Sequence, residues 1–262
     1  EAAGPPAQTR AGVREGVGVV ERVKIIRAAI NGVVDVLMAT GVPTAISLTL
    51  LDLSGGVEAV AFVLAMIICI ILGLGMPTTA AYTVVALLVA PTLISQFAVP
   101  EFAGHFFVFY AAILAGLTPP IATCVAVTCG ISGGGFWGSC KEALRISAPL
   151  FVLPFAFVYH PELVSGVFDY ASLSAGALAL LGSIAIIHGM NYRFAFGRGR
   201  TYGLRAAFFV AGVLAMVHPT QLVQVGALAA VLVLYVLQTV IGRPNPLRAL
   251  RGAAGTLSNR KR

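Results

Sequence analysis

Long apolar stretches separated by short polar segments run along most of this 262-residue chain. The hydrocarbon core of a bilayer is about 30 Å thick, and a helix needs about 20 apolar residues to cross it. The pattern therefore predicts membrane-embedded helices at residues 57–72, 80–99, 106–128, 146–159, 171–188 and 223–241. A more polar stretch, residues 25–51, predicts a further span, whereas residues 206–217 are short for one.

The composition agrees with a protein whose solvent is lipid. Hydrophobic residues make up 58% of the chain and charged residues 10%, whereas soluble domains average about 45–50% and about 25%. So few charges cannot cover a globular surface in water, which predicts an all-α membrane protein, a polytopic helix bundle in the lipid bilayer. The sequence starts without methionine or a signal-peptide pattern, so we interpret it as a fragment or a processed piece.

The net charge of +7 would suit a nucleic acid partner, but the placement of the charges indicates a membrane topology and no nucleic acid. All 17 basic residues fall into four clusters, at residues 10–27, 141–145, 193–205 and 243–262, and the other loops carry only acidic charge. The positive-inside rule places these clusters in the cytoplasm. We expect a multi-pass protein of the cell (cytoplasmic) membrane with both ends cytoplasmic: a polar segment at residues 1–24 and a basic tail at residues 243–262.

The first interruption of a helical pattern lies at the centre of residues 58–99. Residues 73–82 read GLGMPTTAAY, and Gly73, Gly75 and Pro77 disrupt a helix within one turn. A helix can restart after Pro77, because proline suits the first helical turn. A cytoplasmic loop would carry Lys or Arg here and none is present, so we expect a re-entrant helical hairpin over residues 58–99. Two full membrane spans are the alternative, because they also return the chain to the side of the membrane from which it entered.

The second interruption, Thr118-Pro119-Pro120, lies inside a helix predicted over residues 105–131. The two prolines remove two backbone donors and free the carbonyls about one turn earlier, near Gly116. An unsatisfied carbonyl is costly in hydrocarbon, so such backbone is tolerated where it is buried in protein or lines a cavity. We therefore expect a discontinuous transmembrane helix that faces the hairpin tip.

A discontinuous helix opposite a hairpin tip is how many secondary transporters build their ion and substrate sites. Unwound carbonyls and threonine hydroxyls suit a hard cation, and we expect sodium at Thr78, Thr79 and Thr118. The N-termini of half-helices suit an anion instead. The alternative is that the threonines only satisfy interrupted backbone. The candidate ion- and substrate-binding residues are Gly73, Gly75, Pro77, Thr78, Thr79, Gly116, Thr118, Pro119, Pro120 and Thr123.

Two titratable residues are candidates for coupling or gating. Asp35 is the one acidic residue inside a predicted span, where acids are functional candidates by default. It would carry a proton, or else lie at the interface or pair with Arg27. His105 is expected at the outer mouth of the broken helix, as a gate or substrate contact or as a helix cap. The other histidines lie at predicted span ends and are expected to be interfacial: His160, His188 and His218.

Four segments resemble the large membrane subunits of the tripartite ATP-independent periplasmic (TRAP) transporters. Residues 73–82 are similar to that family's GMGLPTTAAY, and residues 104–110 (GHFFVFY) to its AHLFVFYF. Residues 117–120 (LTPP) resemble its ITPP, and residues 151–161 (FVLPFAFVYHP) its IIPFxFVYxP. The resemblance covers residues 28–164 and is to the C-terminal half of DctM-like permeases, of the fused kind that work with TAXI-type binding proteins.

The resemblance implies an elevator-type transporter with two inverted repeats. Residues 25–164 would be the second-repeat transport core, and residues 165–242 additional transmembrane helices. It implies ion-coupled uptake, with sodium as the expected coupling ion and protons as the alternative, of a small organic anion delivered by an extracytoplasmic substrate-binding protein. A small membrane subunit or a fused equivalent is a further expected partner, and no other cofactor is expected.

Two other classes of function compete with secondary transport. A channel-like or structural membrane subunit without coupled transport is the alternative, but two interruptions in one protomer suit alternating access better than a symmetric filter. A membrane enzyme would need several charged or nucleophilic side chains close together at the same depth in the membrane. The predicted topology places Asp35 and His105 on opposite sides of the membrane, which argues against an enzyme.

Overall fold

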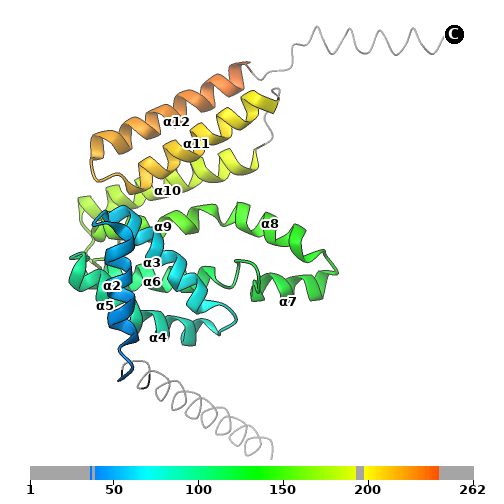
Figure 1. Ribbon diagram of the computed structural model, residues 1–262. Helices are drawn as coiled ribbons and strands as arrows, with labels where there is room; N and C mark the ends of the chain where they lie inside the picture. The colour runs from blue at the N-terminus through cyan, green and yellow to red at the C-terminus, as the bar shows by residue number, and fades with distance from the viewer. Residues whose placement is uncertain (1–35, 37–38, 193–197, 242–262) are drawn as a thin grey trace, which may run out of the picture. The chain divides into compact units, whose positions relative to one another are not determined.

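The computed structural model describes residues 36, 39–192 and 198–241, and the regular elements of this part of the chain are all helices (Figure 1). Four helical stretches among the described residues are long and apolar enough to cross a membrane, one of them being Thr78–Gln96, which consists of two consecutive helices; a bent helix pair would add a fifth. The prediction of an all-α membrane helix bundle is therefore confirmed. The chain divides into two compact units, Glu1–Gly116 and Leu117–Arg262.

The first unit contains the predicted hairpin and the helix that packs against it. Its described helices are α2 (Val42–Ser54), α3 (Glu58–Gly73), α4 (Thr78–Leu88), α5 (Ala90–Gln96) and α6 (Glu101–Leu114). Helix α2 starts after Gly41, has a proline in its first turn and ends at Gly55 in the left-handed conformation, with φ 56°. Residues 25–35 of the span predicted over residues 25–51, with Asn31 and Asp35, lie outside the described part.

Helices α3 and α4 both pack along α6, and small side chains let these backbones approach closely. The fully buried alanines in this contact are Ala61, Ala65, Ala103 and Ala111. Phe62 fills the centre, with its ring centroid 5.8 Å from that of Phe97 and 6.1 Å from that of Phe107. The helical arms thus lie where the hairpin was predicted, whereas its depth in a membrane stays a prediction.

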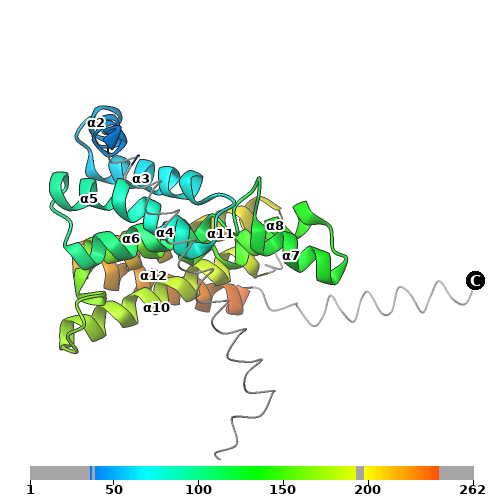
Figure 2. The same cartoon turned by 90° about the horizontal axis from the view of Figure 1, so that it is seen from below.

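The second unit begins with two shorter helices that run beside each other, as Figure 2 shows from below. Its helices are α7 (Thr123–Ser132), α8 (Phe136–Ile146), α9 (Ala148–Tyr159), the 3-10 turn η1 (Pro161–Leu163), α10 (Tyr170–Asn191), α11 (Arg198–Val217) and α12 (Gln221–Ile241). Helix α7 ends at Gly133, whose φ of 69° and N–H bond to the Cys129 carbonyl close the last turn.

Residues 136–145, for which the sequence predicted no helix, belong to helix α8 in the structure. Phe136, Cys140 and Ala143 recur at helical spacing and pack against α7, whereas Arg145 and Glu142 form an exposed ion pair at 2.9 Å. The α8 and α9 axes are bent by 40° with respect to each other. The predicted span 146–159 therefore starts at Ala148 as α9, and Ile146 belongs to α8.

Helices α10 and α11 make the closest helix contact in the second unit. A Cβ atom added to Gly212 would lie 2.7 Å from the Gly182 carbonyl oxygen, and one added to Gly182 would lie 2.5 Å from Met216 Cγ. Such small residues at a helix crossing are typical of membrane bundles, where dispersion contacts drive association. Helix α11 starts at Arg198 and has 20 residues, so the apolar stretch at residues 206–217, which is short for a span, is the second part of a longer helix.

The two ends of α10 differ in charge. At its C-terminal end, Arg145 Nη2 donates to the Met190 carbonyl at 2.8 Å and Arg205 Nη2 to the Tyr192 carbonyl at 3.4 Å. These cations satisfy carbonyls that lack helical partners and complement the helix dipole. At the other end, Asp169 caps the helix by accepting from Ser172 N at 2.8 Å. Two predicted basic clusters therefore contribute arginines to the same end of one helix.

Two glutamine–histidine pairs tie α12 to its neighbours. Gln224 Nε2 lies 2.7 Å from His160 Nε2, and Gln238 Nε2 lies 2.7 Å from His188 Nε2. His160 also contacts the His218 carbonyl at 3.1 Å and is only 7% exposed. His160 is therefore buried among protein groups at the end of α9, and its position at a membrane interface stays a prediction.

The Gly182–Gly212 contact generates the first testable prediction. The Gly212→Ala change forces a methyl group against a backbone carbonyl, and such overpacking costs about 1–3 kcal/mol. We expect a lower melting temperature of the purified full chain in detergent. Gly203→Ala on the same helix meets nothing within 4 Å and serves as the control. Its melting temperature should stay unchanged or rise, since alanine favours a helix by about 1 kcal/mol over glycine. Equal effects of the two changes would contradict the close contact.

Candidate functional site

The first predicted interruption is a tight turn between α3 and α4. Helix α3 ends at Gly73 and α4 begins at Thr78, with Pro77 as its N-cap residue. Met76 N donates to the Gly73 carbonyl at 3.3 Å, and Gly75 has a φ of 76°, in the left-handed region. A residue with a Cβ atom is strained in that conformation, so the turn requires glycine at position 75.

The turn lies directly against the end of α6. A Cβ atom added to Gly73 would lie 3.0 Å from Ala115 Cβ and 3.1 Å from the Ala112 carbonyl oxygen. Gly73 and Ala115 are both buried. Gly116 follows Ala115 directly, so the structure brings the hairpin turn to the segment whose carbonyls the sequence analysis expected to be freed.

The second interruption separates α6 from α7 by eight residues, 115–122. Helix α6 tightens as it ends, because Gly116 N donates to the Ile113 carbonyl at 3.0 Å, three residues earlier. The Pro119-Pro120 bond is cis, and Ala122 has a φ of 41° before α7 begins at Thr123. The backbone is thus non-helical at and around the two prolines, where the sequence predicts the break.

Helices α4 and α7 begin in the same way. Their N-cap residues, Pro77 and Ala122, have no side-chain acceptor, and neither helix has a side-chain cap among the described residues, a property that they share with α2, α3, α5, α6, α8 and α9. The first N–H groups of a helix have no intrahelical partner and carry the positive end of its dipole. Sequence reasoning singled out the hydroxyls of Thr78 and Thr123, whereas the structure adds the uncapped amides of the helices that they start.

The predicted site residues divide between the two units. Gly73, Gly75, Pro77, Thr78, Thr79 and Gly116 belong to the first unit, and Thr118, Pro119, Pro120 and Thr123 belong to the second. Thr78, Thr79 and Thr123 are exposed, and Thr118 is half-buried with its carbonyl accepting from Ala122 N at 3.2 Å. That all of them form one ion site stays a prediction.

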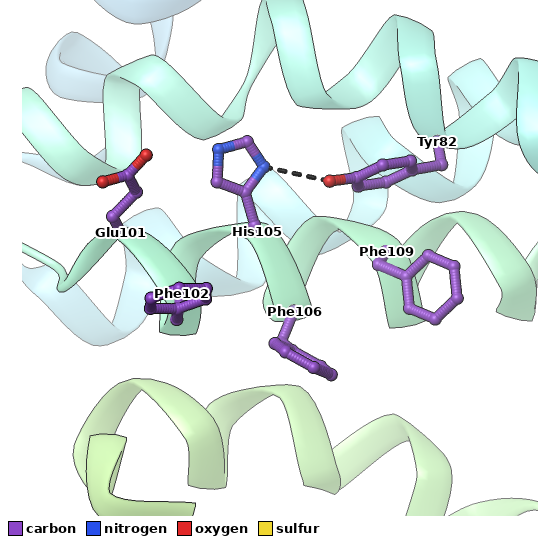
Figure 3. Close-up of a pocket in the computed structure, with 6 residues that line it drawn as sticks. All are labelled: Tyr82, Glu101, Phe102, His105, Phe106 and Phe109. Carbon is purple, nitrogen blue, oxygen red and sulfur yellow. Dashed lines mark hydrogen bonds between the residues drawn. The ribbon is translucent and has the colours of Figure 1, made fainter. Parts of the chain in front are cut away.

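His105 lines a pocket within the first unit, and Figure 3 shows its ring pointing toward the Tyr82 hydroxyl. The Tyr82 hydroxyl oxygen lies 3.1 Å from His105 Nδ1, which joins α4 to α6. The Tyr82 ring also packs edge-on against Phe109, with centroids 5.4 Å apart. The cavity of about 410 Å³ is lined by Tyr82, Glu101, Phe102, His105, Phe106 and Phe109.

Tyr82 was missed as a functional candidate. It closes the GLGMPTTAAY stretch, and only the folded structure places it beside a histidine that follows 23 residues later. Asp35, the other coupling candidate, lies outside the described residues. Among the residues that are described, no group of three or more His, Cys, Asp or Glu side chains could hold a metal ion.

The contact of Gly73 with α6 gives the second testable prediction. Gly73→Val introduces a branched side chain against the Ala112 carbonyl and Ala115, so the turn must move away from α6. We expect loss of substrate uptake by reconstituted protein with normal membrane insertion. Gly130→Val on α7 meets nothing within 4 Å at its Cβ and is the control. Uptake by Gly73→Val at the level of Gly130→Val would show that the contact has no role in transport.

The comparisons with known proteins give a family for this chain. The family described as the tripartite ATP-independent periplasmic transporter, DctM component, matches residues 7–168, which is more than half of the chain. The match spans the hairpin and both interruptions and ends before α10. Comparisons with curated proteins and with solved structures found no match. The chain therefore belongs to the DctM family, the large permease components of secondary transporters of organic acids that work with a binding protein and a small membrane subunit.

Proposed function

We propose that residues 25–164 form the second-repeat transport core of a sodium-coupled permease for a small organic anion. An extracytoplasmic binding protein would deliver the anion, and the protein would lie in the cytoplasmic membrane with its basic clusters on the cytoplasmic side. The observation that carries this proposal is the contact of Gly73 with Ala112 and Ala115. It joins the hairpin turn to the end of an interrupted helix, as in many ion-coupled transporters.

The C-terminal end of α6 suits the sodium ion, and the N-termini of α4 and α7 suit the organic anion. Carbonyls at the tightened end of α6 and the hydroxyls of Thr78, Thr79 and Thr118 are neutral oxygen ligands for sodium. The uncapped N-termini of α4 and α7 offer N–H donors and positive dipole ends to the carboxylate of an organic anion. A cation held beside the anion would also reduce the cost of removing each charge from water, which couples their binding.

The Tyr82–His105 pair is proposed as a gate. It is a side-chain hydrogen bond between a hairpin arm and the helix that the arm packs on, beside a cavity lined mainly by aromatic rings. One such bond contributes only about 0.5–1.5 kcal/mol, so it can hold the arm in place and still be broken during a transport cycle. The carboxylate of Glu101 lines the same cavity.

Uptake measurements on the complete permease with its binding protein, in proteoliposomes, test the ion site. We expect uptake under an imposed sodium gradient, and a loss of about tenfold or more in the Thr78→Ala/Thr118→Ala variant, since each lost ligand costs on the order of 1 kcal/mol. Thr128→Ala is the control, because the Thr128 hydroxyl donates to its own helix at the Cys124 carbonyl.

Two results would contradict this part of the proposal. Uptake by the double variant equal to that of the Thr128→Ala control would reduce the two threonines to backbone support. Uptake driven by a proton gradient alone would replace sodium as the coupling ion and make Asp35 the candidate proton carrier.

The gate is tested by Tyr82→Phe, which keeps the ring against Phe109 and removes the hydroxyl from His105. We expect a change of about two- to tenfold in the sodium concentration at half-maximal uptake, which corresponds to one hydrogen bond. Tyr202→Phe, on the exposed surface of α11, should leave that concentration unchanged. An unchanged value in Tyr82→Phe would make the pair a packing contact.

A further inference from the structure

Helices α10, α11 and α12, which lie beyond the family match, enclose a groove with no assigned role. Its volume is about 550 Å³, within the range of about 300–1,000 Å³ typical of ligand pockets. One wall is the face of α10 from Leu181 to His188, the other is the face of α12 from Val225 to Tyr235, and Phe208 of α11 lies between them. Except for His188 and the Tyr235 hydroxyl, the lining side chains are apolar.

The glutamine–histidine pairs flank the part of α12 that lines the groove. Gln224 and Gln238 hold α12 at positions 14 residues apart, about 21 Å along the helix, and the lining residues of α12 lie between them. Of the four candidate spans, α12 is the least buried, with 17% of its residues buried against 28–39% in the others. Helix α12 packs along α11, is tied to His160 and His188 near its two ends, and leaves an apolar groove toward α10 between these two pairs.

One end of the groove is polar and has unused hydrogen-bonding groups. Gln238 is 6% exposed, and its Oε1 has no hydrogen-bond partner among the described residues. Either orientation of this amide leaves one of its polar atoms without a partner. The Nε of Arg205 is also buried without a partner in the described part of the chain. Both side chains are linked to the groove through His188, which lines it: Gln238 contacts His188 directly, and Arg205 donates to the carbonyl of Tyr192, whose ring stacks on His188.

We propose that this groove binds one acyl chain of an anionic phospholipid from the surrounding bilayer, with the phosphate headgroup at Arg205. A purely apolar ligand would fill the groove and leave the buried arginine and amide groups without partners. A phospholipid offers an apolar chain to the groove and an anionic, hydrogen-bonding headgroup to its polar end. Basic pockets between transmembrane helices are typical headgroup sites, and Arg200, exposed on the first turn of α11, adds positive charge at this end.

Native mass spectrometry of the delipidated full chain tests the proposal. The probes are phosphatidylglycerol and phosphatidylcholine with identical acyl chains, each titrated separately. We expect one tightly bound phosphatidylglycerol, about fivefold tighter than phosphatidylcholine, since one arginine contributes about that factor to binding an anionic lipid. Arg205→Gln should abolish the preference and leave equal affinities for the two lipids.

A matched pair of variants tests the position. Ala229 lines the groove, whereas Ala230, the next residue on α12, does not. Ala229→Phe fills the groove in place of the acyl chain and should abolish the tight lipid, whereas Ala230→Phe should retain it. Equal lipid binding by the two variants, or equal affinity of the unmodified chain for the two lipids, would overturn the proposal. A dimer that only Ala229→Phe dissociates would also overturn it, by assigning the groove to a second copy of the chain.

Discussion

The backbone polar groups of helix ends are the constraint on which this structure depends, because lipid offers them no hydrogen bonds. Helix α10 has side-chain partners at both of its ends. Asp169 caps the start of α10, and Arg145 and Arg205 donate to the carbonyls at its end. The two helices that restart after an interruption, α4 and α7, begin without a side-chain cap in the described structure, as do α2, α3, α5, α6, α8 and α9. Helix ends that the fold leaves incomplete are the places where a transported ion or anion can complete the coordination.

Helix association in this protein follows from the same solvent. Apolar side chains gain little by leaving lipid for a protein interior, so contacts between helices come from close backbone approach and from polar pairs. The Gly182–Gly212 crossing and the turn at Gly73 are of the first kind, and the pair His160–Gln224 is of the second. These contacts are specific to position, since a Cβ atom added at Gly212 meets atoms at 2.7 Å and one added at Gly203 meets nothing within 4 Å.

The two units present different chemistry to the membrane. The first carries the hairpin turn and the Tyr82–His105 contact, and both belong to the part of the chain that the DctM family covers. The second extends past that part with α10, α11 and α12, which enclose an apolar groove with a basic end. The proposed transport site and the proposed lipid site therefore involve separate groups of residues.

The sequence by itself determined the features that depend on local chemistry. Hydropathy located the membrane helices, and Gly75, Pro77 and the prolines at 119 and 120 located both interruptions, because these residues restrict the backbone wherever they occur. Only the tertiary structure decided which residues meet. His160 and Gln224 are 64 positions apart, and a tightly packed glycine such as Gly73 looks like any other until α6 lies against it. Such contacts depend on how the helices pack together, and that packing is a property of the whole fold rather than of any one segment.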